Sequence, residues 1–489
     1  MPSTSERIKM LIGFEFILDE APLLIEVAKK LKERKIRIIG VTLDNRWNFL
    51  LKNSSFTLVN LGDYLKTNWN RTIITNELLE KYENKYGNNH DLSFFINVDR
   101  LINDVNKKKF KTWEDKLKFL LLHFDFWEEF FEKYDVDAFY TTDTALLASL
   151  AGMAIAQHKG VRFKAINTTR DSEPRVVFVD NYEDRWTSVN NIYEELLKRE
   201  LTYEEEQFAR NYLEEFRQKA KKPVYMGHSW HISGFRLPYV KEFLRRVERK
   251  IVYKWGRDRF DYVTPPPLRR ALKETKVILK RKFLTSFYFK TGKSLNKKYI
   301  FFPLQLQPEE STDICGKWYS NQIATVEYIS KALPLNYKLY VKEHKVAVGK
   351  REGLLSYYEK LRRLPNVVLV HPFADSHEVI KHADLVIVIS GTVGWEALLY
   401  GKPVITLGNV FYNNSGLVYK VSDLGELKKA ICHLSKNYQL DKDKLLKYIL
   451  ALKYGTYEGY FNVPHTDTRV MERENIKKLA KGIYDEVTS

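Results

Sequence analysis

The chain has 489 residues and a formal net charge of +18, with 44% hydrophobic and 29% charged residues. This length exceeds what one hydrophobic core serves, so we expect two globular domains with additional helices. Only two cysteines occur, Cys315 and Cys432, which excludes a disulfide framework and a cysteine-rich zinc site. The sequence contains no apolar run of about 18 residues, and charged residues interrupt the N-terminus where a signal peptide needs its apolar stretch. We therefore expect a cytoplasmic protein without a membrane-spanning helix.

The N-terminal part alternates strand and helix patterns. Arg7–Ile12 and Ile36–Leu43 have the composition of strands, and Leu23–Glu33 between them has helical spacing of apolar residues. This βαβ pattern predicts a Rossmann-like domain, which we place over residues 1–234. No glycine-rich phosphate loop follows its first strand. We therefore expect a nucleotide to bind elsewhere in the chain, and this domain to bind the second substrate, the acceptor.

Polar side chains follow two of the expected strands in this domain. Asp143 comes after Ala138–Thr141 and is our candidate catalytic residue, because a carboxylate at a strand end that faces the cleft can act as a base or nucleophile. The alternative is that Asp143 only caps the next helix. Arg170 and Arg175 follow Val161–Ile166 and are predicted to bind an anionic sugar or the acceptor, since guanidinium groups pair with carboxylate and phosphate. Surface ion pairs are the alternative for both arginines.

Residues 235–298 form a basic segment with 20 Lys and Arg against 5 Asp and Glu, and so contain most of the net charge. Apolar and aromatic residues alternate with these bases, a pattern typical of helices that lie on an anionic leaflet. A solvated basic helix pair packed on the domain is the alternative. We expect an anionic membrane surface as partner and no nucleic acid, because no nucleic-acid-binding motif is present.

The C-terminal half returns to a regular alternation of strands and helices. The expected strands are Tyr299–Leu304, Tyr337–Val341, Val367–Val370, Leu385–Ile389 and Val404–Leu407. This alternation predicts a doubly wound parallel sheet over residues 299–440. Residues 441–489 are expected to be helices that pack back on the N-terminal domain.

One stretch in this half, Ala383–Gly408, reads ADLVIVISGTVGWEALLYGKPVITLG. Its first strand ends at the small residues Ser390, Gly391 and Thr392, which can start the following helix. A turn of this kind directs backbone N–H groups and a helix N-terminus toward a phosphate. Glu396, one turn inside the helix, would accept hydrogen bonds from a ribose diol, or would only favour the helix dipole.

Three segments resemble the capsule polysaccharide biosynthesis family, whose members are GT-B glycosyltransferases that include β-Kdo transferases using CMP-Kdo. They are SGTVGWEALLYGKPVITLGNVFY from Ser390, FFPLQLQPEEST from Phe301 and YVKEHKVAVGKR from Tyr340. The resemblance covers Lys298 to about Tyr419 well and the first half faintly. Lys345 departs from the family, which usually has proline there, and this position bears on the choice of donor nucleotide.

The resemblance implies an α/β, GT-B-like fold of two Rossmann-like domains facing a central cleft, with added helices. It also implies that His344 contacts the nucleotide phosphate or base and that Lys342 adds positive charge. Gln305 and Gln307, at the end of the first strand of the domain, are suited to hydrogen-bond a sugar. The residues predicted to bind the donor nucleotide are Lys342, His344, Ser390, Gly391, Thr392, Gly394 and Glu396.

We expect a metal-independent glycosyltransferase that moves a sugar from a nucleotide-sugar donor, CMP-activated favoured, to a surface or capsular polysaccharide or a lipid-linked glycan. No DxD pair suited to a divalent ion stands at a strand end, and no cofactor is predicted. The enzyme would be peripheral on the inner face of the cell membrane. Two alternatives stay open: a CDP-alditol phosphotransferase of teichoic-acid type, and a non-catalytic capsule polysaccharide assembly or export factor.

Overall fold

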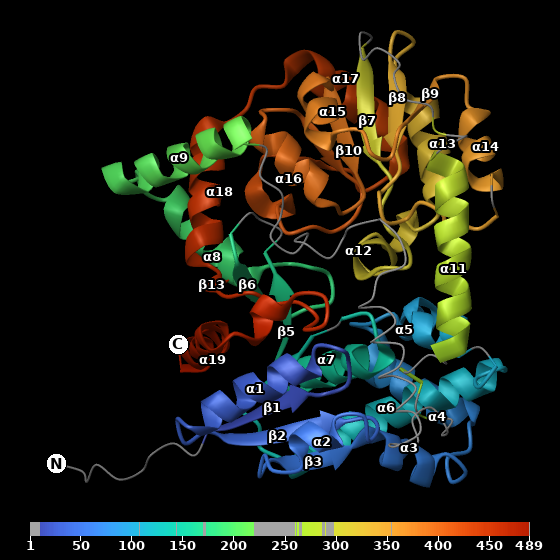
Figure 1. Ribbon diagram of the computed structural model, residues 1–489, viewed down its shortest axis with the longest axis vertical. Helices are drawn as coiled ribbons and strands as arrows, with labels where there is room; N and C mark the ends of the chain where they lie inside the picture. Colours follow the sequence, from blue (N-terminus) through green and yellow to red (C-terminus); the bar gives the residue numbers. More distant parts are fainter. Residues whose placement is uncertain are drawn as a thin grey trace. The chain divides into compact units, whose positions relative to one another are not determined.

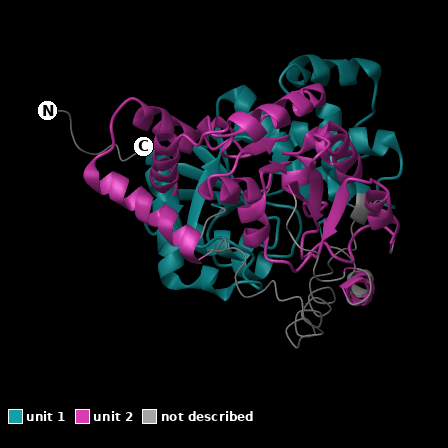
Figure 2. Ribbon diagram, turned by 90° about the horizontal axis from the view of Figure 1, so that it is seen from above, with its two compact units in different colours: residues 1–182, 224–270, 457–489 teal, residues 183–223, 271–456 magenta. Residues whose placement is uncertain are grey.

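The computed structural model describes residues 10–106, 108–142, 144–169, 173–219, 260, 262–263, 267–285, 289, 298–353 and 355–488. The chain folds into two compact units, each built on its own sheet (Figure 1, Figure 2). The first unit comprises residues 1–182, 224–270 and 457–489, and the second comprises residues 183–223 and 271–456.

The first unit has a seven-stranded sheet with strand order β13-β6-β5-β4-β1-β2-β3. Its strands are β1 (Leu11–Glu15), β2 (Arg37–Thr42), β3 (Thr57–Asn60), β4 (Ala138–Thr141), β5 (Arg162–Thr168), β6 (Arg175–Val179) and β13 (Tyr457–Glu458). Strands β1 to β5 pair in parallel, whereas β6 runs antiparallel to β5 and β13 antiparallel to β6. Helices cover a parallel sheet on both faces, which explains why its central strands are continuous apolar runs.

The helices of the first unit follow the predicted apolar spacing where they are long. They are α1 (Ala21–Lys32), α2 (Asn48–Leu51), α3 (Leu61–Asn68), α4 (Asn76–Tyr82), α5 (Leu92–Val98), α6 (Trp113–Lys133), α7 (Leu147–Lys159) and α19 (Arg473–Thr488), with the π-helical turns η1 (Glu83–Gly87) and η2 (Leu101–Val105) and the 3-10 turn η9 (Thr468–Met471). A reciprocal capping box between Thr112 and Asp115 starts α6. Gly160, at φ 69°, ends α7 in the left-handed conformation that glycine adopts most readily.

The end of the chain from Tyr457 belongs to the first unit. Strand β13 pairs with β6, and α19 contributes Leu479, Ala480 and Ile483 to the core that also buries the apolar face of α1. The sequence predicted that the chain returns to the first domain earlier, from residue 441. The structure instead keeps α18 in the second unit and begins the return after it.

The second unit has a six-stranded, parallel sheet with strand order β12-β11-β10-β7-β8-β9. Its strands are β7 (Tyr299–Pro303), β8 (Lys338–Lys342), β9 (Val367–Val370), β10 (Leu385–Val388), β11 (Val404–Thr406) and β12 (Tyr419–Lys420). Its helices are α8 (Thr187–Leu197), α9 (Tyr203–Lys219), α11 (Pro267–Phe283, from Ala271 on), α12 (Glu310–Asp313), α13 (Gln322–Ala332), α14 (Ser356–Arg362), α15 (Ser376–His382), α16 (Thr392–Leu399), α17 (Leu427–Asn437) and α18 (Lys442–Tyr454), with the 3-10 turns η6 (Lys317–Tyr319), η7 (Asn413–Ser415) and η8 (Leu424–Glu426). The predicted parallel sheet is therefore confirmed.

Helices α8 and α9 lie in the second unit, although the sequence placed them in a first domain ending at residue 234. Side-chain contacts explain this difference. Trp186, just before α8, stacks on Phe411 with ring centroids 4.2 Å apart, and the Tyr193 hydroxyl donates to the carbonyl of Ser415 at 2.7 Å. Two Rossmann-like units with added helices thus make up the protein, as the predicted α/β fold class requires.

Much of the predicted basic segment, including residues 235–259, lies outside the described residues. The part that the structure describes as a helix is α11. Of the helices described, none combines the length and the apolar composition needed to cross a bilayer.

Candidate functional site

The predicted donor residues gather at one edge of the sheet of the second unit, where its parallel strands end. Lys342 is the last residue of β8, Gln305 follows β7 and Ser390 follows β10. Strand β7 lies between the other two strands. In open parallel sheets, ligands bind at this carboxyl edge. The structure therefore brings together the residues that the sequence suggested from three separate segments.

The turn after β10 is held by the side chain of Gln305. With its amide oxygen facing the turn, Gln305 accepts hydrogen bonds from the N–H groups of Ser390 and Gly391, each at 2.9 Å, and its amide nitrogen donates to the Ser390 hydroxyl at 3.2 Å. The Ser390 hydroxyl donates in turn to the carbonyl of Ser311. These bonds use two of the backbone donors that the sequence left open for a ligand. They also engage the Gln305 amide that was predicted to bind a sugar.

Two backbone donors of the turn remain available at the start of α16. The N–H groups of Thr392 and Val393 have no hydrogen-bond acceptor in the part of the chain that the structure describes, whereas the N–H of Gly394 donates to Gly391 at 3.3 Å. N–H groups at the first turn of a helix attract anions, because they coincide with the positive end of the helix dipole. The start of α16 is thus suited to hold one phosphate oxygen or a similar anion.

Gly394 is required for the packing behind this turn. A Cβ atom at this position would lie 2.1 Å from the Tyr412 hydroxyl oxygen, and that hydroxyl donates to the carbonyl of Gly391 at 2.7 Å. Because Gly394 has no side chain, the Tyr412 hydroxyl can approach the turn closely enough to form its hydrogen bond with Gly391. We expected Gly394 at the nucleotide, and the structure gives this glycine a steric reason of its own.

Glu396 is a buried carboxyl group one turn into α16. Burial raises the pKa of Glu396 to about 7, while the positive charge of Lys342 and a hydrogen bond from Thr392 lower this pKa in part. The carboxyl is consequently close to half ionised at neutral pH. In its ionised form it accepts hydrogen bonds from a diol, as the sequence suggested for a ribose.

Lys342 presents a buried ammonium group to the same edge. Its side chain is 5% exposed, and within the described residues its ammonium has neither a hydrogen bond nor an ion pair. Burial, with a smaller contribution from the charge of Lys345, lowers the pKa of Lys342 to about 8, while Glu343, Glu396 and Asp375 act in the opposite direction. Because an unpaired buried charge is costly, an anion at this place would be stabilised by Lys342.

His344 lies two residues later, in the loop that follows β8. Its Nδ1 atom accepts a hydrogen bond from the N–H of Val346 at 3.3 Å, so the ring proton is on Nε2. Burial lowers the pKa of His344 to about 4, and the nearby positive charges of Lys342 and Arg351 add to this effect. His344 is thus a neutral imidazole at physiological pH and acts as a hydrogen-bond donor without charge.

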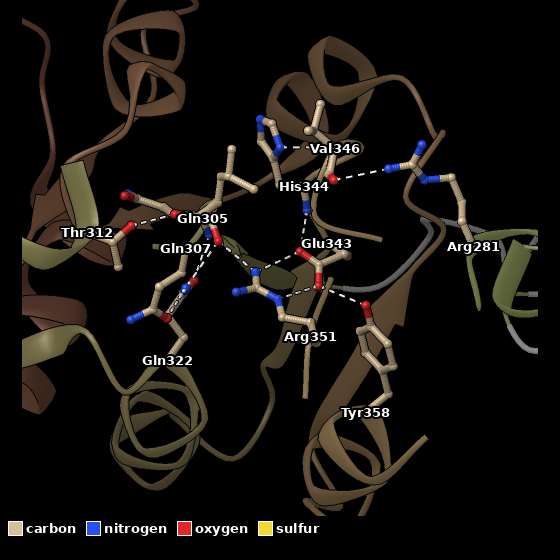
Figure 3. Close-up of polar contacts among 11 residues, drawn as sticks. Arg281, Gln305, Gln307, Thr312, Gln322, Glu343, His344, Val346, Arg351 and Tyr358 are labelled. Carbon is tan, nitrogen blue, oxygen red and sulfur yellow. Dashed lines mark hydrogen bonds and ion pairs between the residues drawn. The ribbon is translucent and has the colours of Figure 1, made fainter. Parts of the chain in front are cut away.

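A buried ion pair that the sequence analysis missed supports this loop (Figure 3). Arg351 donates from Nε to Oε2 of Glu343 at 2.9 Å and from its terminal nitrogen to Oε1 at 2.8 Å. Glu343 also accepts from the Tyr358 hydroxyl at 2.9 Å and from the N–H of His344 at 2.7 Å. Arg351 further donates to the carbonyl of Gln305 at 2.6 Å. The pair therefore ties the ends of β7 and β8 to the loop that contains His344.

The second predicted glutamine, Gln307, is also engaged within the protein (Figure 3). Its amide oxygen accepts from Gln322 at 3.3 Å, as Figure 3 shows. Its amide nitrogen donates to Asp313 at 3.0 Å. Gln322 additionally pairs with the backbone of Gln305 in both directions. These contacts place both glutamines in the frame of the site, and a contact of either with a sugar stays a prediction.

In the first unit, the structure describes one of the three predicted site residues. Asp143 and Arg170 lie outside the described residues. Arg175, the first residue of β6, lines a small open pocket together with side chains from the chain end after β13. Those lining residues include Tyr460, Asn462 and Asp467. At the end of β1, the buried Glu15 carboxylate accepts hydrogen bonds from the hydroxyls of Thr141 and Ser149.

Within the described residues, no group of three or more His, Cys, Asp or Glu side chains is arranged to hold a metal ion. The donor-side features are instead two backbone N–H groups, one ammonium, one neutral imidazole and one carboxyl group. Such a set pairs with an anion next to a hydroxylated group.

A comparison with known protein families finds a match in the part of the chain that contains this site. Residues 287–450, about a third of the sequence, match the family model described as capsule polysaccharide biosynthesis protein. This confirms the predicted resemblance to this family over residues 287–450. The matched residues include every residue of the donor-side edge described above.

One curated relative is Protein FixF of Sinorhizobium fredii (strain NBRC 101917 / NGR234), which is 29% identical over 222 residues. The match covers 44% of this chain and 48% of that protein, so the chain spans about half the length of this relative.

Solved structures of low similarity include Thermosulfurimonas dismutans KpsC, beta Kdo 2,4 transferase, with 15% identity over 65% of this chain and 79% of that chain and a TM-score of 0.35. UDP-GlcNAc 2-epimerase from Neisseria meningitidis has 13% identity over 98% of this chain and 100% of that chain, with a TM-score of 0.28. At these TM-scores the two structures add nothing to the description of the fold.

Proposed function

We propose that the protein is a glycosyltransferase of the capsule polysaccharide biosynthesis family that binds a nucleotide-sugar donor at the sheet edge of its second unit. The observation that supports this most is the position of Lys342. Its ammonium is buried without a partner among the described residues, at the same edge as the open N–H groups of Thr392 and Val393. An anion with several oxygens, such as a nucleotide phosphate, would satisfy all three donors.

The rest of the donor would be bound by groups around this anion site. Glu396, which lies in electrostatic range of Lys342, would accept hydrogen bonds from the ribose diol. His344 would donate a hydrogen bond from Nε2–H to a phosphate or base oxygen. We favour a CMP-activated sugar, as the family resemblance implies, and a surface or capsular polysaccharide or lipid-linked glycan as acceptor.

These groups would also assist the departure of the nucleotide. Negative charge develops on the leaving phosphate as its bond to the sugar breaks, and donors fixed before the reaction stabilise that charge. Lys342 and the start of α16 would supply this stabilisation in place of a metal ion. Because the Glu343–Arg351 pair fixes the loop that follows Lys342 and contains His344, little reorganisation would be needed at the moment of reaction.

Asp143 is the proposed base or nucleophile of the first unit. Asp143→Asn keeps an oxygen able to cap a helix, so the free energy of unfolding should change little, while turnover should fall by at least about 10²-fold. Turnover equal to that of the wild type would leave Asp143 with the role of a helix cap. Arg170 and Arg175 are the proposed contacts of an anionic sugar or acceptor.

Thermal unfolding in the presence of CMP, CDP, UDP and GDP sugars tests the proposed donor. A ligand at 100 times its dissociation constant stabilises the protein by about 2.7 kcal/mol. Stabilisation by a CMP sugar, followed by transfer to a glycan acceptor, is the expected result. Stabilisation by a CDP-alditol with transfer of its phosphate would support the phosphotransferase alternative. Stabilisation by glycan and by no nucleotide would support a non-catalytic assembly factor.

We also propose that the enzyme works at the cytoplasmic face of the cell membrane, as a peripheral protein. The observations in favour are the net charge of +18 and its concentration in residues 235–298. Polybasic segments are attracted to anionic leaflets.

A further inference from the structure

Helix α11, in the predicted basic segment, is fastened to the second unit by one of its faces. Arg281 donates to the carbonyls of Val346 and Val348, each at 3.2 Å, and Figure 3 shows its side chain reaching from α11 to this loop. Lys280 donates to the carbonyl of Gly353 at 3.1 Å. At Gly349, where φ is +83°, a Cβ atom would lie 2.6 Å from the carbonyl oxygen of Val277. The side of α11 around Arg281 is thus its packed face.

The other face of α11 presents apolar side chains to solvent. Leu272 is 58% exposed, Leu279 is 64% exposed and Phe283 is 40% exposed. Seven residues make about two turns of an α-helix, so Leu272 and Leu279 lie on one line along the axis, and Phe283 continues that line one turn later. A surface helix of a globular protein normally directs its apolar stripe to the core. In α11 these three residues, the outer stripe, point the other way.

Exposed lysines border the outer stripe on both sides. At 100° per residue, Lys276 lies about 40° from Leu272 around the helix on one side, and Lys282 lies about 80° away on the other side. Both side chains are exposed, as is that of Lys273 on the same side as Lys276. An apolar line with exposed lysines on either side matches a surface with hydrocarbon beneath negative headgroups.

We propose that the outer stripe of α11 docks on an anionic lipid surface, with Leu272, Leu279 and Phe283 inserted between the headgroups and the lysines paired with lipid phosphates. The charge of the flanks favours this occupant over an uncharged one. A single line of three side chains is also narrower than the patch of about 800 Å² that a stable protein partner covers. The surface would hold the proposed transferase at its membrane, but the docking does not depend on the donor site.

Co-sedimentation of the full-length protein with vesicles of phosphatidylglycerol and phosphatidylcholine tests this surface. We expect the protein to bind the mixed vesicles and to bind pure phosphatidylcholine far more weakly. Leu272→Gln with Leu279→Gln keeps the charge and removes the apolar insertion, and should lower the partition coefficient at least about 10-fold. Lys276→Gln with Lys282→Gln should lower it by about 30-fold, at about 5-fold for each lysine.

Matched controls lie elsewhere on the second unit. Lys428→Gln with Lys429→Gln changes the net charge equally through two exposed lysines of α17. Leu335→Gln removes a fully exposed leucine far from α11 in sequence. Both controls should bind vesicles like the wild type, and all variants should melt like the wild type because the replaced side chains are exposed.

Three results would overturn the proposal. The first is binding of the leucine pair variant equal to that of the wild type. The second is an equal loss in the lysine controls, which would show attraction by net charge alone. The third is a dimer in sedimentation analysis without lipid that the leucine pair variant abolishes, because the stripe would then be covered by a second copy of the chain. Transfer to a soluble acceptor measures the catalytic activity separately, and it should not change in the stripe variants.

Discussion

Arg351 and Glu343 form a two-bond ion pair inside the second unit, with donor–acceptor distances of 2.9 and 2.8 Å. Both side chains are buried, and the Tyr358 hydroxyl completes the pairing of the carboxylate. Glu343 also accepts from the backbone of His344, the residue proposed to contact the donor. The geometry of the donor loop thus depends on an arginine that comes eight residues after the carboxylate it holds.

Arg351→Met should destabilise the protein strongly. The substitution leaves the Glu343 carboxylate buried without its cation, and breaking a buried pair in this way costs about 3–5 kcal/mol. Urea denaturation of both proteins measures the difference in unfolding free energy. The double variant Glu343→Gln with Arg351→Met removes both charges and should recover much of the loss. A double variant no more stable than Arg351→Met would contradict this account of the pair.

Gly394→Ala tests the packing of the turn. The new methyl group would meet the Tyr412 hydroxyl at 2.1 Å, so Tyr412 or α16 must move. Overpacking of this kind costs about 1–3 kcal/mol. Tyr412→Phe removes the hydroxyl and should return part of that stability in the Gly394→Ala background, while lowering stability by itself because its bond to Gly391 is lost. Additive effects of the two substitutions in denaturation curves would show that they do not interact.

Much of the second unit could be predicted because local patterns determine it. The strands Val367–Val370 and Leu385–Val388 are short apolar runs between turn residues, which the sequence shows directly. Strand β6, next to the edge strand β13, escaped notice, and β13 lies within the C-terminal region that was expected to be helical. Their antiparallel pairing joins Arg175 and Val176 to residues about 280 positions later, and no local spacing reports such a contact.

The sequence predicted the residues of the candidate site better than the contacts between them. The segments around Lys342 and Ser390 were identified, since both follow buried strands. The partner of the turn was not, because an amide such as Gln305 is equally suited to bind a ligand or the backbone, and only the fold decides that it binds the N–H groups of Ser390 and Gly391. The Glu343–Arg351 pair was missed for a similar reason, since charged residues in a loop are usually solvated.

Lys342→Met should stabilise the protein without ligand while weakening nucleotide binding. The pKa of Lys342 is lowered from 10.5 to about 8, so holding the ammonium charged at pH 7 costs stability, and this cost disappears as pH rises from about 8 toward 10.5. Removing the charge should raise the unfolding free energy at pH 7 by about 1–3 kcal/mol. Chemical denaturation at pH 7 and titration with the preferred nucleotide measure the two effects.

Lys338→Met serves as the control for Lys342→Met. Lys338 is the first residue of β8, so it lies at the end of the strand away from Lys342, and its side chain donates to a backbone carbonyl there. It should change neither nucleotide affinity nor stability by more than about 0.5 kcal/mol. A Lys342→Met protein that is less stable than the wild type and binds nucleotide equally well would assign Lys342 to the core and not to the donor site.

Glu396→Gln examines the proposed ribose contact through its pH dependence. Burial raises the pKa of Glu396 from 4.5 to about 7, so the unfolding free energy of the wild type should fall as pH rises from about 4.5 to 7, and the variant should lack this part of the fall. If the ionised carboxylate binds the diol, nucleotide affinity of the wild type should increase as Glu396 ionises between pH 6 and 8, and should decrease again above pH 8 as Lys342 loses its proton. The variant should bind about 10 to 150 times more weakly at pH 8, since a charged hydrogen bond contributes about 1.5–3 kcal/mol.

Calorimetric titration of both proteins with the same nucleotide measures this difference, because the titration of the ligand's own phosphate is the same for both proteins and cancels. Equal affinities, with parallel pH profiles, would mean that Glu396 only complements the dipole of α16, and the donor site would then rest on Lys342, His344 and the N–H groups of Thr392 and Val393.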